Sequence, residues 1–524
     1  MHASNWGGIA AVICLYGVFL AVGWAASRRV KNDAVAGLLV AGRAMPFWMA
    51  TLTMAATWID GGYLLGTAEG VFASLASGWQ GGVFFGLSLV LGGVFFARRM
   101  RQLQFVTLID PLALRFGKHW AAVLSLPALL GEILWSAELL IAVAASFGVM
   151  LGMDLTTAIL VSAAVVTSYT IAGGMWSVGY TDTVQFLLIP IGLFVALPFA
   201  LDAAGGLDAC WSYYRQQQGA AALIVPPLEA QGYWTAPRIV SWWDLSIMLA
   251  LGGIPWNCYF QRIQSCQTPV KAQWHSIVAG VLTIGLTVPP LLLGLAAFAY
   301  TGWTPQAREQ LHAAPTMALP LLLSEAVPPL VAIVGLTAIV GAVTSSFSAS
   351  ILSAGSMISW NVGRGLVAPR ITALAMRRLI RVSILGLGAL AAVLALHVQS
   401  VQQLWFFTSD LVFVLLFPQL VFALFDARAN RTGSMVAFGV SLALRLGGGE
   451  PILAIPAWIP YAEIFQAVLP GGPEVWLAES GHATLFPVRT FAALVGMVLL
   501  PLVSRATARW DPPRPLRNPS ADAA

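Results

Sequence analysis

The stretch ATWIDGGYLLGTAEG, residues 56–70, lies inside an apolar span that is long enough to cross a bilayer. Its middle does not suit an ordinary helix, because Gly61 and Gly62 directly follow Asp60. Each Gly costs roughly 1 kcal/mol relative to Ala in a helix interior, and an acid at the bilayer centre costs at least ~2.5 kcal/mol. Membrane proteins accept both where a helix is broken and its free backbone groups line a ligand site. The stretch therefore predicts a broken transmembrane helix.

A second apolar span carries an interruption of the same kind, LGGIPW at residues 251–256. Pro255 has no backbone N–H and breaks a helix at this point. Two interrupted helices in corresponding places of two halves are the sequence signature of a secondary transporter. This is the working hypothesis for the whole chain.

The composition indicates an all-α polytopic membrane protein. Of the 524 residues, 58% are hydrophobic and only 9% are charged, whereas soluble domains carry about 25% charged residues. The net charge of +5 does not indicate nucleic-acid binding, because the basic residues lie in short loops between apolar spans. By the positive-inside rule these loops are cytoplasmic. The rule predicts an N-terminus outside the membrane and a C-terminus in the cytoplasm.

Thirteen apolar spans are expected to form one transporter domain over residues 1–504, followed by a cytoplasmic tail at 505–524. The first helix covers residues 7–26, repeat one about 46–201, repeat two about 244–425, and extra helices about 434–446 and 486–503. Five spans per repeat, each set with one broken helix, predict a leucine-transporter-like 5+5 inverted repeat with its site near the membrane midplane. We see no P-loop and no hydrolase nucleophile motif, so neither ATP-driven transport nor an enzyme is predicted.

Three tryptophans lie deep in spans, beside helix breaks or acids: Trp58, Trp135 and Trp256. Indole rings more often anchor a protein at the membrane interface, or pack in its core. Converging aromatic faces are also the usual receptacle for a quaternary ammonium ion, at about 0.5–2 kcal/mol per desolvated contact. From the residues alone, packing and an aromatic cage both stay open.

Hydroxyl groups and acids supply further candidates. Ser345 and Ser346 can offer two oxygens to a hard cation, although small residues also let membrane helices pack closely. Acids within spans are costly and usually functional. They are Asp60, Glu69, Glu132, Glu138, Asp182, Asp244 and Asp410. We expect Asp244 and Asp410 to lie at span ends or to bond backbone amides.

Several runs, in order and over almost the whole chain, resemble the sodium/solute symporter family. They are ATWIDGGYLLGTAE (56–69), LSLVLGGVFFARRMR (87–101), PALLGEILW (127–135), YTDTVQ (180–185), LGGIPWNCYFQR (251–262), SILSAGSM (350–357), SDLVFVLLFPQL (409–420) and LRLGGGEP (444–451). GGIPW with YFQR, and GGGEP, are typical of the choline-transporting branch of that family.

The resemblance implies specific site residues. Choline would bind an aromatic cage whose matching positions are Trp58, Trp135, Trp256 and Trp405. Phe85 stands where the family has a cage tyrosine, and Trp405 would act as a lid. A sodium ion would bind the carbonyls of Ala55, Trp58 and Ala342 with the hydroxyls of Ser345 and Ser346.

Two positions depart from the choline branch, which has an Asp where this chain has Ser348 and a Gly where it has Asp60. Our hypothesis is that Asp60 supports cation binding at the substrate site. The departures leave the sodium stoichiometry open, as well as whether chloride is needed.

The sequence thus predicts a sodium-coupled symporter that imports choline or a related quaternary ammonium compound by alternating access. A symporter for betaine, carnitine or proline is the alternative, but a carboxylate needs a cationic partner and we see no Arg deep within a span. A transporter-like receptor is a further alternative. We expect the protein in a plasma membrane, and its Arg-rich, Ala- and Gly-rich composition favours a bacterial inner membrane. Whether it forms a homodimer stays open.

Overall fold

The computed structural model describes residues 4–29, 35–397, 401–450, 453–479 and 485–516. These residues form a bundle of helices, and no β-strand occurs among them. The long helices are α1 (Ser4–Ser27), α5 (Leu75–Leu91), α8 (Lys118–Leu151), α9 (Leu155–Ala203), α13 (Pro269–Gly285), α14 (Val288–Ala299), α17 (Pro329–Ser356), α18 (Ala373–His397), α19 (Val401–Phe425), α20 (Arg431–Gly447) and α23 (Val488–Thr507). The all-α prediction is therefore confirmed.

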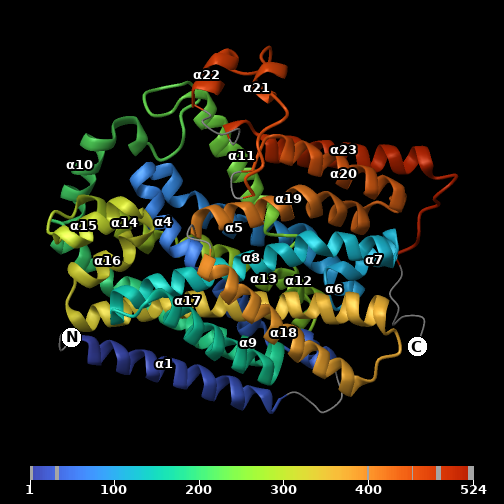
Figure 1. The fold of residues 1–524 in the computed structure, drawn as a ribbon, viewed down its shortest axis with the longest axis horizontal. Helices are drawn as coiled ribbons and strands as arrows, with labels where there is room; N and C mark the ends of the chain where they lie inside the picture. Colours follow the sequence, from blue (N-terminus) through green and yellow to red (C-terminus); the bar gives the residue numbers. More distant parts are fainter. Residues whose placement is uncertain (1–3, 30–34, 398–400, 451–452, 480–484, 517–524) are drawn as a thin grey trace.

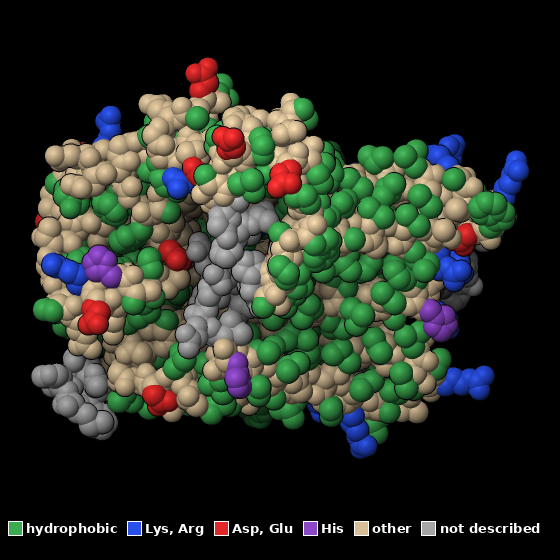
Figure 2. Space-filling model, turned by 45° about the horizontal axis from the view of Figure 1, so that its top comes forward, with side chains coloured by type: hydrophobic (Ala, Val, Ile, Leu, Met, Phe, Trp, Pro, Cys, Tyr) green, Lys and Arg blue, Asp and Glu red, His purple; other side chains and the backbone are tan. Residues whose placement is uncertain are grey.

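Shorter elements connect the long helices. They are α2 (Val35–Val40), η1 (Ala41–Arg43), η2 (Gly92–Ala97), α6 (Arg98–Leu103), α7 (Ile109–Phe116), α10 (Leu207–Gln218), η3 (Gly219–Ala222), α15 (Pro305–Ala313), η4 (Pro315–Met317), α16 (Ala318–Glu325), η5 (Met357–Val367), α21 (Tyr461–Ile464) and α22 (Gly472–Glu479). Figure 1 shows α10, α15 and α16 at one end of the bundle and α6 and α7 at the other. Figure 2 shows hydrophobic side chains over much of the right half of the molecule, with Lys and Arg at its outer edge.

Among the described residues, ten helical segments are long and apolar enough to cross a membrane. One of them, α9, divides into two helices at Gly174, whose φ of +53° leaves the helical region. A side chain could not be placed there, because a Cβ would collide with the carbonyl of Leu38. The ten segments, the second half of α9, the pair α3–α4 and the shorter α20 together correspond to the thirteen expected spans.

Both predicted helix breaks are present. The first span divides into α3 (Phe47–Trp58) and α4 (Gly61–Ala73), and Asp60 caps α4 by accepting a hydrogen bond from the Tyr63 amide. The second divides into α11 (Ala236–Gly252) and α12 (Asn257–Ser265). An N-cap acid followed by glycines starts a helix rather than continuing one, which explains why the break falls at residues 59–60.

The centre of the bundle is α17, which packs against α8, α9 and the end of α3. Every residue of α17 from Ala338 to Ser356 is buried. Both broken helices also contact α17, through α3, α4 and α12. The free ends of two interrupted helices are thus held against a helix whose second half is fully buried.

Candidate substrate and sodium sites

An aromatic cavity lies at the break between α3 and α4. Its walls come from both broken helices and from α5, α8 and α19. The lining residues are Thr57, Trp58, Asp60, Phe85, Trp135, Trp256, Cys258, Thr408 and Ser409. Four of the five rings predicted for the cage therefore meet here, although they are separated by up to about two hundred residues in sequence. The side chain of Trp405 lies outside the described residues, and its role as a lid stays a prediction.

The rings form a compact wall. The ring centroids of Trp135 and Trp256 are 5.2 Å apart at an interplanar angle of 71°. Trp58 makes a similar edge contact with Tyr259, at 6.0 Å. The free space is about 30 Å³, enough for two or three water molecules at about 10–15 Å³ each. A trimethylammonium group therefore requires the walls to move apart.

Asp60 is buried beside these rings and orients one of them. Its carboxylate accepts hydrogen bonds from the Tyr63 amide and from the indole Nε1 of Trp135, both at 2.7 Å. One donor comes from the positive end of α4 and the other from the indole N–H, and both complement a carboxylate. Asp60 therefore places negative charge next to the cavity while fixing the ring plane of Trp135. The sequence did not indicate this contact, since the two residues are 75 positions apart.

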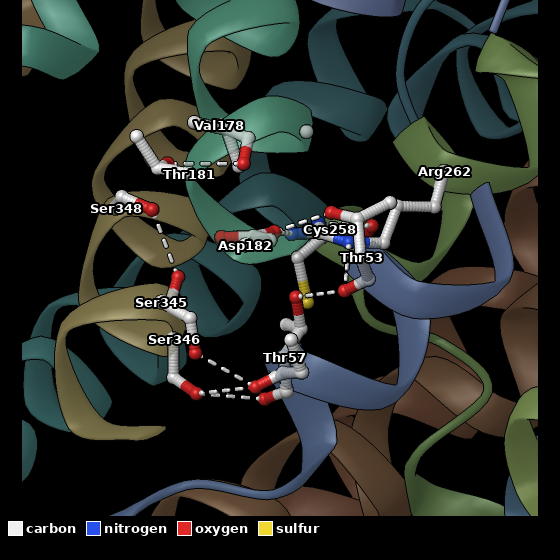
Figure 3. A network of polar contacts seen from close by, with 12 residues as sticks. Thr53, Thr57, Val178, Thr181, Asp182, Cys258, Arg262, Ser345, Ser346 and Ser348 are labelled. Carbon is white, nitrogen blue, oxygen red and sulfur yellow. Dashed lines mark hydrogen bonds and ion pairs between the residues drawn. The ribbon is translucent and has the colours of Figure 1, made fainter. Parts of the chain in front are cut away.

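The predicted sodium ligands lie where α17 faces the end of α3 (Figure 3). The Ser345 hydroxyl is 2.8 Å from the Ala56 carbonyl and 2.7 Å from that of Ala342. The Ser346 hydroxyl is 2.9 Å from the Thr57 carbonyl. Hydroxyls and the carbonyl end of a broken helix are the donors that transporters use for sodium, so the residues present fit that ion.

The predicted sodium ligands on α17 lie together, but the carbonyls of α3 that face them differ from the predicted ones. The serine pair and Ala342 lie together, as the resemblance implies. On α3, however, the carbonyls that contact the hydroxyls belong to Ala56 and Thr57, whereas the Ala55 carbonyl accepts the Ile59 amide at 3.0 Å. The roles of Ala55 and Trp58 as ligands thus stay predictions.

A buried ion pair lies next to this junction (Figure 3). Arg262 on α12 contacts Asp182 on α9 at 3.1 Å, with side-chain exposures of 1% and 0%. The same guanidinium donates to the carbonyls of Thr53 and Cys258, and the Thr53 hydroxyl donates to Asp182. We expected no Arg deep within a span; Arg262 lies three residues before the end of α12, yet it is fully buried between helices. Its donors are nevertheless occupied by protein groups rather than turned to a substrate carboxylate.

Three of the other intramembrane acids, Glu132, Asp244 and Asp410, link helices to one another. Glu132 on α8 accepts a hydrogen bond from Ser350 at 2.8 Å, and another from Ser353. The serine-rich face of α17 therefore supplies hydrogen bonds as well as close packing. The acids that we expected at span ends form ion pairs: Asp410 with Arg445 at 2.6 Å, and Asp244 with Arg489 at 3.2 Å.

The LRLGGGEP run contributes to this second network. Arg445 also contacts Glu450, at 2.7 Å, so one guanidinium joins an acid on α19 to the segment after α20. Asp244 additionally accepts the Thr490 amide at 2.8 Å, as expected of a backbone-bonded acid. These contacts join α11, α19, α20 and α23, and none of the residues that form the ion pairs lines the aromatic cavity.

Comparison with known proteins agrees with this architecture. Residues 38–440 match the sequence model of the Sodium:solute symporter family. The chain is 35% identical to High-affinity choline transporter 1 of Drosophila melanogaster, over 95% of this chain and 78% of the relative. It is 35% identical to High affinity choline transporter 1 of Homo sapiens, over 87% of this chain and 79% of that one.

Solved structures show the same fold at low sequence identity. A Na⁺-coupled sialic acid symporter, in its substrate-bound outward-open state, aligns with a TM-score of 0.76 at 17% identity, over 97% of this chain and 98% of that one. Mhp1, a nucleobase-cation-symport-1 family transporter, aligns with a TM-score of 0.55 at 14% identity, over 92% and 97%. The leucine-transporter-like fold is thereby confirmed, and the match over residues 38–440 shows that the chain belongs to the sodium:solute symporter family.

Proposed function

We propose that this protein is a sodium-coupled symporter that imports choline, or a closely related quaternary ammonium compound, by alternating access. The observation that carries the proposal is the convergence of Trp58, Phe85, Trp135 and Trp256 on one cavity at a helix break. Ring faces attract a cation that has no N–H to donate. The relatives named as choline transporters, at about 35% identity over most of the chain, support the same substrate.

Coupling follows from the position of the first broken helix between the two sites. Trp58 and Asp60 wall the cavity, while the carbonyls of Ala56 and Thr57 face Ser345 and Ser346 on α17. Any change at the junction of α3 and α17 therefore moves a wall of the cavity. Sodium bound there supplies a positive charge that holds the carbonyl end of α3 against α17. The cavity must widen to admit substrate. Sodium that closes the junction between α3 and α17 therefore favours the outward-open, substrate-competent arrangement of the cavity walls.

A zwitterionic substrate such as betaine, carnitine or proline is less well served. Its carboxylate needs a cationic or amide partner near the rings. Arg262, the buried guanidinium near the cavity, is engaged by Asp182, Thr53 and Cys258. Asp60, which lines the cavity, repels a carboxylate instead.

We further propose that the protein lies in a plasma membrane, which in a bacterium is the inner membrane, and that its orientation follows from its basic residues. The basic α6 lies together with α7 at the end of the bundle opposite α10, α15 and α16 (Figure 1). The positive-inside rule favours the end with α6 and α7 as cytoplasmic. This orientation puts the N-terminus outside and the tail from residue 505 inside, beyond a transporter domain over 1–504.

The function is tested by uptake of labelled choline into proteoliposomes, with and without an inward sodium gradient. We expect sodium-dependent uptake that unlabelled choline blocks and that proline leaves unchanged. Sodium-independent uptake would contradict the sodium site while leaving the cage intact. Stronger competition by betaine than by choline would overturn the substrate assignment but retain the fold and the coupling.

Asp60→Asn is expected to raise the KM for choline about fivefold, because it removes roughly 1 kcal/mol of attraction from a negative charge next to the cavity. The amide keeps the shape of the side chain but has only one acceptor oxygen, so it can keep one of the two hydrogen bonds, that from the Tyr63 amide or that from the Trp135 indole. Asp154→Asn is the matched control, since Asp154 caps α9 in the same way at an exposed position. If Asp60→Asn changes neither the KM nor the sodium dependence, the hypothesis for Asp60 fails.

A further inference from the structure

A second cavity, of about 410 Å³, lies between α7, the beginning of α8 and the π-helical η5. Its walls are mostly apolar, with two cationic side chains among them. They comprise Phe105, Ile109, Asp110, Ala113, Leu114, Lys118, Ala121, Ala122, Trp360, Asn361, Arg364, Gly365 and Pro369. The cavity is separate from the aromatic cage and shares no residue with it.

The carboxylate of Asp110 holds the cavity wall together. It accepts hydrogen bonds from the Val106 and Thr107 amides, from Asn361 at 2.8 Å and from the Trp360 indole at 3.1 Å. These donors join the segment before α7 to η5 and compensate the charge of the carboxylate. Asp110 is thus a structural anion with its acceptor capacity used, not an open site for a metal.

Two cations flank the cavity without acidic partners. Arg364 lies four residues after Trp360 on η5, and its guanidinium is 4.2 Å from that ring centroid. Lys118 begins α8 and is exposed, like Arg364. Within the described part of the chain neither side chain forms an ion pair. Arg514 adds positive charge nearby, since its guanidinium lies against Gly117.

An apolar surface continues from this cavity along a helix that spans the membrane. Leu126 and Leu130 follow Ala122 at intervals of four residues, so they lie on neighbouring turns of one side of α8. Their side chains are 61% and 41% exposed. A cationic pocket at the end of a spanning helix, followed by exposed leucines, is the arrangement that an anionic headgroup with an attached acyl chain would match.

We propose that this cavity binds an anionic phospholipid. Its phosphate lies between Lys118 and Arg364, and an acyl chain runs from Ala122 over Leu126 and Leu130. The occupant carries a negative charge because two unpaired cations border the cavity, and it is a lipid because the walls and the adjoining surface of α8 are apolar. The proposal is independent of the transported substrate.

The test is native mass spectrometry of the purified full-length protein in detergent, titrated with phosphatidylglycerol. The double substitution Lys118→Gln/Arg364→Gln is expected to raise the Kd of the first bound phosphatidylglycerol about 30-fold, because each cation contributes a factor of about five. Arg98→Gln/Arg509→Gln is the matched control, since these exposed arginines lie on α6 and just after α23. This control removes the same charge and should leave that event unchanged. Ala122→Trp fills the cavity with both cations retained, and it should also abolish the first binding event.

Each other outcome contradicts the proposal. An equal loss of phosphatidylglycerol binding in the Arg98→Gln/Arg509→Gln control would show that the lipid is attracted by the basic surface in general and not by this cavity. Equal binding of phosphatidylcholine would remove the requirement for negative charge. Displacement by inorganic phosphate, together with unchanged binding to Ala122→Trp, would show an anion site rather than a lipid site. Thermal unfolding of each variant establishes whether it is folded. If Ala122→Trp does not fold, the double variant Lys118→Gln/Arg364→Gln decides the question.

Discussion

Trp256→Ala is expected to raise the KM for choline about 30-fold, because a desolvated cation–π contact contributes about 2 kcal/mol. Trp256 lies at the break before α12 and lines the cavity, where its ring also supports Trp135. The loss should fall on affinity, as the mutation removes a face that binds the cation. The measurement is initial uptake rate in proteoliposomes as a function of choline concentration at saturating sodium.

Trp48→Ala is the control for this experiment. Trp48 lies on α3, the helix that also carries Trp58, but its side chain is 52% exposed. Removing an exposed ring changes stability by about 0.5 kcal/mol or less, so we expect a change of KM within about twofold. Equal effects of the two substitutions, in proteins with the same thermal stability, would argue against the cage.

The second large effect is expected at the serine pair. Ser345→Ala or Ser346→Ala should raise the sodium concentration for half-maximal uptake about tenfold or more, because a bond to a charged group contributes about 1.5–3 kcal/mol. The double substitution should abolish the stimulation by sodium. Uptake is measured at fixed choline over a range of sodium concentrations, with a neutral osmolyte rather than choline chloride compensating for the omitted sodium salt.

Ser359→Ala provides the comparison for the serine pair. Ser359 is buried on η5, which continues from α17, and donates to the Gly355 carbonyl at 2.6 Å. It therefore tests the loss of a buried hydroxyl from the same continuous segment, away from α3. A sodium curve that is the same for the wild type and both serine-pair variants would refute the assignment of the ion to this junction.

The sequence indicated the architecture because its signals are local. The break at residues 59–60 follows from an acid and two glycines in succession, and the break before α12 from Gly253 and Pro255. Helix lengths follow from runs of apolar residues. The convergence of the cage rings came from resemblance to a family, since spacing in sequence does not reveal which helices pack together.

The contacts missed by sequence reasoning are long-range pairings of polar side chains. Arg262 reads as a basic residue at a span end, yet it is buried against Asp182, 80 positions away. Asp60 reads as an acid at a helix break, and its hydrogen bond from an indole of α8 has no local signal in the sequence. The same holds for Asp410 and Arg445. Such pairs depend on how neighbouring helices are rotated, which a single sequence does not encode in any local pattern.

The indole of Trp135, with its N–H held by the Asp60 carboxylate, gives the protein a built-in optical reporter. Indole emission depends on the charge around the ring, and three of the chain's twenty tryptophans wall the cavity. A cation entering between them should change the intrinsic fluorescence without any label. Titrations of ligand and of salt could then be followed separately in detergent solution, which would distinguish binding from translocation.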